Sequence, residues 1–181
     1  MFFAKLQSQH EIYASKHTRH SEWSVAMPQL VKGGKYAYAW SKVNNQGKII
    51  IPREALTEYK LLTWNKVVLV PGSKRSGGFG VTSVELIEKS ALHSILDEHP
   101  QLSKFQINEG EAIDIKGKTL CWVKMNKDGS IIVPVKTLKK YGIRPNDRLL
   151  SVRGSCLALG FIVKGPIVNE AQKHLNIEVY E

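Results

Sequence analysis

Basic side chains recur beside two similar turns of this 181-residue sequence, and their charged groups could bind phosphate. Lysine is a compact point charge, so contacts of this kind would follow the backbone and shape of duplex DNA rather than its base edges. For any single lysine, a solvated surface position is the simpler interpretation, but recurrence beside a repeated turn favours phosphate contact. The candidate DNA-binding residues are Lys42, Lys48, Arg53, Lys124, Lys127, Lys136, Lys139 and Lys140.

The overall charge also favours a polyanionic partner. The chain has 26 Lys and Arg against 16 Asp and Glu, a formal net charge of +10 and a pI near 9.6. Such an excess creates a positive field that attracts nucleic acid. Charge does not decide the function, because many soluble proteins are basic. The 43% content of hydrophobic residues indicates an ordered chain with a core.

No arrangement of residues predicts a catalytic, cofactor-binding or metal-binding site. His93 and His99 are six positions apart and do not share a helix face. The segment 72–78 resembles a phosphate-binding loop but lacks the Gly-Lys-Ser/Thr ending. Cys121 and Cys156 form neither a Cys-x-x-Cys pair nor a disulfide framework, so we expect reduced thiols buried in the core. The sequence therefore predicts a protein that is not an enzyme.

The two turns belong to one repeated unit. Trp40–Leu61 aligns without a gap on Trp122–Ile143, a shift of 82 residues from Trp40 to Trp122. Two copies predict a duplicated module rather than a solenoid, which needs three or more. The identical pairs include Lys42/Lys124, Asn44/Asn126, Gly47/Gly129, Ile49/Ile131, Ile50/Ile132, Pro52/Pro134, Leu56/Leu138 and Tyr59/Tyr141.

Each copy predicts strand, hairpin turn, strand, helix, turn, strand, loop and strand. Tyr36, Tyr38 and Trp40 alternate with small residues, which predicts a strand with one aromatic face. The Asp128-Gly129 pair is a strong hairpin signal in the second copy. A short helix is expected at 53–60 in the first copy, after a proline that ends the preceding strand.

The helix of the second copy carries clearer signals. Pro134 suits its first turn, and Val135, Leu138 and Tyr141 form a buried stripe. Gly142 stands where a left-handed C-cap is expected. One copy is too small to bury a core alone, so the two copies should pair. The expected fold class is mostly β with short helices, that is, α+β.

The sequence divides into five parts. In the connection, Ser90 is expected to cap a helix that ends near Pro100, followed by a loop and a strand. Gly165-Pro166 is expected to break the chain before a short helix at 169–175. The parts are an N-terminal extension (1–34), which the sequence predicts to be mobile, a first module (35–82), a helical and loop connection (83–117), a second module (118–165) and a C-terminal segment (166–181).

The repeated unit resembles the swapped-hairpin fold of the AbrB/SpoVT family, which includes MazE-type antitoxins and MraZ. The resemblance rests on the hairpin sequence of 129–134 and the turn sequence of 142–147, and it extends over roughly half of the chain. It implies that two hairpins interlock into one small β-barrel whose basic loops bind DNA. The tandem copies, as in MraZ, would let one chain supply both halves, and a homo-oligomer is also expected.

This sequence departs from the family pattern at several positions. Asn146 replaces the turn glycine in the second copy, and Lys60 replaces the helix-end glycine in the first. The arginine that follows the hairpin glycine in the family is Lys48 in one copy and Ser130 in the other. The first copy also has Glu58 where the second has Lys140, so the second copy is the better candidate for a DNA-binding surface.

The leading hypothesis is therefore a cytoplasmic DNA-binding transcriptional regulator with double-stranded DNA as its partner. The cytoplasmic expectation rests on the absence of a signal-peptide pattern and of an apolar run of about 18 to 20 residues. The alternative is an antitoxin-like or scaffold module that binds a protein partner and keeps the barrel without DNA binding. The missing family arginine and the Glu54/Glu58 pair favour the alternative.

Overall fold

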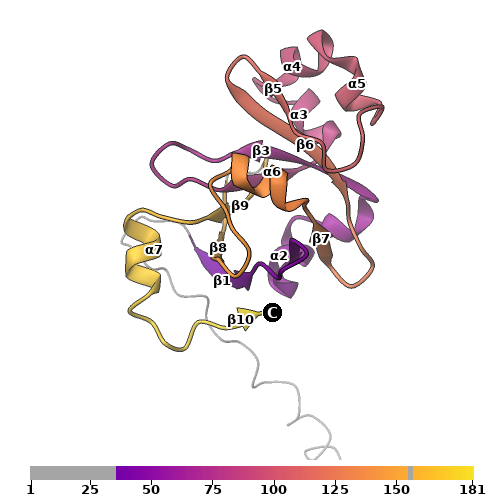
Figure 1. The fold of residues 1–181 in the computed structure, drawn as a ribbon. Coiled ribbons are helices and arrows are strands. Elements are labelled where there is room, and N and C mark those ends of the chain that lie inside the picture. The colour runs from indigo at the N-terminus through magenta and orange to yellow at the C-terminus, as the bar shows by residue number, and fades with distance from the viewer. Residues whose placement is uncertain (1–35, 155–156) are drawn as a thin grey trace, which may run out of the picture.

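Strand-forming runs between the turns of the two repeats assemble into one large sheet and one small sheet (Figure 1). The computed structural model describes residues 36–154 and 157–181. The strands are β1 (Ala37–Lys42), β2 (Lys48–Ile50), β3 (Lys66–Pro71), β4 (Phe79–Thr82), β5 (Ile113–Ile115), β6 (Lys118–Lys124), β7 (Ser130–Ile132), β8 (Arg148–Val152), β9 (Leu159–Ile162) and β10 (Val179–Tyr180). The helices are α2 (Arg53–Glu58), the short 3₁₀ helix η1 (Leu61–Thr63), α3 (Val84–Glu88), α4 (His93–Glu98), α5 (Pro100–Ser103), α6 (Val135–Lys140) and α7 (Pro166–Ala171).

The strands of one repeat pair with the strands of the other. The eight-stranded sheet has the order β10-β1-β8-β9-β4-β3-β6-β5, and β2 pairs with β7 in a separate two-stranded sheet. The first strand of each repeat therefore lies antiparallel to the third strand of the other, as β1 with β8 and β6 with β3. The two fourth strands, β4 and β9, also pair. The two repeats thus complete one another within a single chain.

The α+β class is confirmed, but the described strands do not form the closed barrel that the resemblance implies. Segments outside the repeats extend the large sheet at both edges. The β10 strand adds in parallel to β1, and β5 adds antiparallel to β6. These additions occupy the two edges of the large sheet, and the β2–β7 ladder stays separate from it. The result is an open, mixed sheet rather than a barrel.

The main core draws its side chains from both repeats. Phe79 and Phe161 are fully buried with ring centroids 5.4 Å apart, and Tyr141 packs on Phe79 at 5.5 Å. Burying each such aromatic side chain stabilises the fold by about 1.5 to 3 kcal/mol. Ile49 and Ile131, which face each other across the β2–β7 ladder, are also fully buried. The β2–β7 pair therefore covers the core that both repeats share.

Two smaller clusters lie outside this core, and equivalent tryptophans anchor them. Trp40 packs with buried residues of α7, and Trp122 packs with buried residues of α4 and α5. Figure 1 shows α7 on the opposite side of the molecule from α4 and α5. The prediction that Tyr38 and Trp40 share one face is wrong, because Tyr38 belongs to the main core. The pairing of β1 with β8 shifts register between Ala37 and Ala39, which interrupts the alternation.

The connection contains three short helices instead of the single helix expected. Ser83, not Ser90, is an N-cap, and its hydroxyl accepts a hydrogen bond from the Leu86 N–H at 3.2 Å. The Ser90 hydroxyl instead accepts from the Leu92 N–H two positions later, a local turn that competes with helix. Pro100 begins α5 rather than only ending α4, since proline is well suited to a first helical position.

The C-terminal helix also begins earlier than the sequence predicts. Gly165 has φ 101°, a conformation that favours glycine, and Pro166 is the first residue of α7. The expected helix at 169–175 is therefore α7 at Pro166–Ala171. The expected N-terminal extension, 1–34, lies outside the described residues. Within the described part of the chain, no helix is long and apolar enough to span a membrane.

The repeat helices form where the sequence predicts them. Gly142 follows α6 in the left-handed conformation (φ 74°), as expected for a C-cap. Lys60 occupies the equivalent position after α2 with φ 52°, although it has a side chain. Asn146 has φ 70°, which explains how it can replace the turn glycine of the family pattern, because asparagine tolerates this region better than most residues.

Candidate nucleic-acid interface

The hairpin turn of each repeat lies against the helix start of the other. The Ile51 N–H donates to the Gly129 carbonyl and the Val133 N–H donates to the Gly47 carbonyl, both at 3.0 Å. A side chain at Gly47 would lie 2.0 Å from the Val133 carbonyl oxygen, and one at Gly129 would lie 2.4 Å from Leu56. Both glycines have positive φ, so the close approach and the turn require glycine. This contact between the turn of one repeat and the helix start of the other positions the candidate cations near the turns.

An ion pair joins the two repeats across this exchange. Lys48 Nζ, at the start of β2, lies 2.9 Å from Asp128 Oδ2 in the opposite turn. The Ser130 hydroxyl and Lys48 both donate hydrogen bonds to Asp128 and lower its pKa to about 2. The positive charge of Lys48 is therefore partly offset by a carboxylate beside it.

Lys42 and Lys124, which are equivalent in the repeats, are each paired with a carboxylate from outside the repeats. Lys42 Nζ lies 3.3 Å from Glu181 Oε1, and Lys124 Nζ lies 3.3 Å from Glu109 Oε2. In both places a backbone hydrogen bond joins a residue near the carboxylate to the repeat tryptophan, Trp40 or Trp122. Both lysines are therefore less available to phosphate than the sequence predicts.

Helix α6 carries three further candidate lysines, Lys136, Lys139 and Lys140. Lys140 Nζ lies 2.6 Å from Asp114 Oδ2, and this hydrogen bond is the main cause of a lowered pKa at Asp114. Lys136 and Lys139 are exposed. Lys136 and Glu109 line one cavity between α6 and the connection. Among the described residues, an ion pair therefore offsets the charge of Lys140 but not the charges of Lys136 and Lys139.

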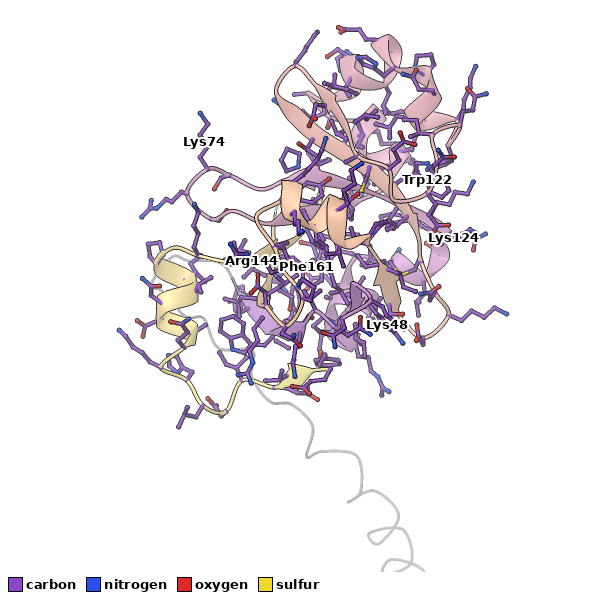
Figure 2. All side chains as sticks on the ribbon, viewed as in Figure 1. Lys48, Lys74, Trp122, Lys124, Arg144 and Phe161 are labelled. Carbon is purple, nitrogen blue, oxygen red and sulfur yellow. The ribbon has the colours of Figure 1, made fainter. Side chains whose placement is uncertain are left out.

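Four of the eight candidate residues have no carboxylate within ion-pair distance among residues 36–154 and 157–181. They are Arg53, Lys127, Lys136 and Lys139. Among the eight cations, Arg53 and Lys127 line one cavity and Lys136 and Lys140 line another. Lys48 and Lys124 are labelled in Figure 2. The eight candidates thus fall into two groups: four cations that pair with a carboxylate and four for which the described residues offer no such partner.

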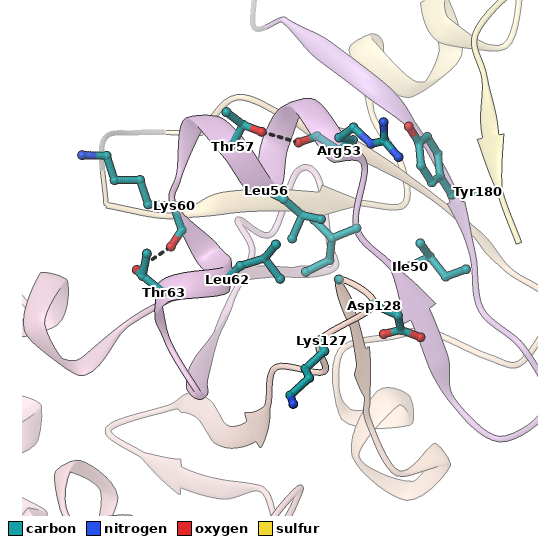
Figure 3. Close-up of a pocket in the computed structure, with 12 residues that line it drawn as sticks. Ile50, Arg53, Leu56, Thr57, Lys60, Leu62, Thr63, Lys127, Asp128 and Tyr180 are labelled. Atoms are coloured by element: carbon teal, nitrogen blue, oxygen red, sulfur yellow. Dashed lines mark hydrogen bonds between the residues drawn. The ribbon is translucent and has the colours of Figure 1, made fainter.

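Arg53 and Lys127 come from different repeats and line the same cavity, of about 460 Å³ (Figure 3). Lys60 also lines this cavity, although the sequence did not single it out as a candidate. The sequence feature that could have identified Lys60 is the replacement of the helix-end glycine by a lysine. The remaining lining residues are Ile50, Ile51, Leu56, Thr57, Leu62, Thr63, Asp128, Gly129 and Tyr180.

In the sequence, Glu58 counts against a DNA-binding surface in the first repeat. In the structure its negative charge is offset by an ion pair. Arg153 Nε lies 2.7 Å from Glu58 Oε1, and Tyr38 donates a hydrogen bond to Glu58 Oε2 at 2.7 Å. Burial opposes the ionisation of Glu58, but the hydrogen bonds from Arg153 and Tyr38 outweigh it and lower the pKa of the carboxyl. Sequence patterns do not reveal Arg153 as the partner, because it lies 95 residues from Glu58 along the chain.

No family model, curated protein or solved structure matches the chain. The AbrB/SpoVT likeness therefore rests on the repeated motif and its glycines, prolines and turn residues.

Cys121 is buried in the main core, as expected, and burial raises the pKa of its thiol to about 12. Such a thiol is inert as a nucleophile at neutral pH. Cys156 lies outside the described residues.

Proposed function

We propose that this chain is a DNA-binding transcriptional regulator of the AbrB-like swapped-hairpin type, with both halves of the module supplied by one chain. The observation that carries the proposal is the exchange of turns and helices between the repeats. It brings Arg53 and Lys127 to one cavity and leaves Lys136 and Lys139 exposed on the other repeat helix. A homo-oligomer and a cytoplasmic location are part of the proposal.

The proposed contact is to phosphate rather than to bases. Lysine side chains dominate the set, and they offer single charges without the bidentate geometry that reads guanine. Affinity would then come mainly from release of counterions, with a contribution from DNA shape. The net charge of +10 supports the same mode of binding, since it would draw DNA to the surface before specific contacts form.

The experiment is retention of promoter-length duplex DNA at several salt concentrations, with wild type and with Lys136→Glu/Lys139→Glu. The double variant should bind weakly and with a shallower salt dependence, by about 0.9 in log–log slope for each phosphate that it no longer neutralises. Lys104→Glu/Lys118→Glu is the matched control, because both residues are exposed on the connection and β6 and the charge change is equal. Equal weakening in both variants would show that only net charge matters.

A second function, a protein-interaction module without DNA binding, is favoured by one observation. Four of the candidate cations, Lys42, Lys48, Lys124 and Lys140, are paired with carboxylates. Surface ion pairs of this kind are worth about 0 to 1 kcal/mol each, so DNA phosphates could still compete for these lysines. Co-purification of one specific protein without enrichment of DNA would support the second function instead.

A further inference from the structure

The cavity between the two repeats has an apolar floor that phosphate contact does not use. Leu56 of α2 and Leu62 of η1 lie near one another in it, and Ile50 of β2 lines the side toward Asp128 and Tyr180 (Figure 3). Leu62 is 54% exposed and is one of four exposed large apolar side chains in the described residues. The volume of about 460 Å³ lies within the range of roughly 300–1,000 Å³ typical of ligand pockets. We call this cavity and its lining residues the Leu62 groove.

The rim of the Leu62 groove is positively charged. Arg53, Lys60 and Lys127 line it, and none of them has a carboxylate within ion-pair distance in the described part of the chain. The acid at the rim, Asp128, is already paired with Lys48 at 2.9 Å. A partner that fits this groove therefore needs negative charge around an apolar centre.

The second repeat lacks the features that make this groove. At the shift of 82 residues, Leu62 corresponds to the exposed Arg144, and Arg53 corresponds to Val135. Leu56, in contrast, recurs as the buried Leu138, which shows that the fold requires it. Leu62 and its surrounding cations are therefore not needed to fold the repeat, and an exposed leucine beside an apolar cavity with a polar rim is typical of an interaction site.

We propose that the Leu62 groove binds an acidic peptide segment of a partner protein. One bulky apolar side chain of the segment sits on Leu56 and Leu62, and flanking carboxylates pair with Arg53, Lys60 and Lys127. An apolar anchor seated in a pocket with a polar rim is the usual source of binding energy in protein interfaces. Duplex DNA offers phosphates but no apolar side chain to fill the floor, so this site goes beyond the proposed DNA contacts.

The test uses the full chain with ¹³C-labelled Ile and Leu methyl groups and short fluorescent peptides as probes. The main probe has acidic residues on both sides of one leucine or phenylalanine. One matched peptide has alanine in place of the apolar residue, and a second has glutamine in place of the acids. The main probe should bind and shift the methyl signals of Ile50, Leu56 and Leu62, whereas both matched peptides should bind at least about tenfold more weakly.

Leu62→Ser should weaken binding of the main probe about tenfold, and Leu175→Ser, at a 96% exposed leucine beyond α7, should leave it unchanged. The proposal is overturned if no probe peptide binds, or if the alanine peptide binds as well as the main probe. It is also overturned if light scattering shows a dimer that Leu62→Ser converts to a monomer, because the groove would then hold a second copy. Duplex DNA that shifts the same methyl signals while no peptide does would equally contradict it.

Discussion

Lys48 Nζ lies 2.9 Å from Asp128 Oδ2, so the second strand of one repeat is joined by an ion pair to the hairpin turn of the other. The pair stands at the place where the two repeats exchange their turns and helices. It holds one candidate DNA contact beside a negative charge.

Asp128→Asn should increase affinity for duplex DNA at low salt. The change removes the carboxylate beside Lys48 while its amide oxygen can still accept the Ser130 hydrogen bonds, and Asn-Gly is as good a turn as Asp-Gly. If the freed lysine contacts a phosphate, the log–log salt slope should steepen by about 0.9. Glu85→Gln, which frees Lys89 beyond α3, is the control and should have no effect. Identical binding by Asp128→Asn and wild type would exclude Lys48 as a contact.

The ionised Asp128 carboxylate, which accepts hydrogen bonds from Ser130 and from Lys48, should also stabilise the fold in a pH-dependent way. The folded pKa of Asp128 is lowered from 3.8 to about 2, so its contribution is present above the unfolded value and lost as pH falls from about 3.8 through about 2. Urea unfolding across this range should show the difference between wild type and Asp128→Asn shrinking as the solution becomes more acidic. A difference that grows with acidity would contradict the lowered pKa.

Lys60→Gly should stabilise the protein by about 0.5 to 1 kcal/mol. Lys60 has φ 52°, and a side chain in this region costs about 1 to 2 kcal/mol, part of which the greater freedom of glycine in the unfolded chain cancels. Gly142→Lys is the reciprocal variant at the equivalent position. No atom lies within 4 Å of a Cβ added there, so it should destabilise through backbone strain alone, by about 1 kcal/mol. Chemical denaturation measures both, and equal signs would refute the argument.

Gly47→Ala should destabilise the protein by at least about 2 kcal/mol. The added Cβ would lie 2.0 Å from the Val133 carbonyl oxygen, which belongs to the other repeat, and the positive φ adds strain. Gly117→Ala has a similar φ of 75° but open space around it, so it should cost only about 1 kcal/mol. If thermal or urea unfolding finds the two variants equally destabilised, the turn of one repeat does not pack on the other as described.

Much of the fold could be predicted because the duplicated sequence carries local signals twice. Alternation, the Asp-Gly turn and the proline before each helix locate β1, β2, α2, β6, β7 and α6 within a few residues. The signals failed where competing local bonds decide the outcome. Ser90 forms a turn instead of a helix cap, and Pro166 begins a helix that it was expected to precede. The expected helix does end before Pro100, as α4, but Pro100 also begins α5, which the sequence did not predict.

The candidate site could be predicted only in part, because its charges depend on contacts between distant segments. The repeated motif identifies Lys42, Lys124 and Lys140 as candidate contacts. Their carboxylate partners, Glu181, Glu109 and Asp114, come from outside the repeats. Strands from the same outside segments, β5 and β10, form the two edges of the large sheet. No periodic pattern encodes which acidic residue a folded chain brings to which lysine.

The most direct measurement is the salt dependence of binding between the wild-type chain and a fluorescent duplex of promoter length. Arg53, Lys127, Lys136 and Lys139 have no carboxylate within ion-pair distance among the described residues, and four phosphate contacts correspond to a log–log slope of about −3.6. We expect the wild-type chain to bind the duplex at low salt with a slope at least this steep. Absence of binding at low salt, or binding whose affinity does not change with salt, would contradict it.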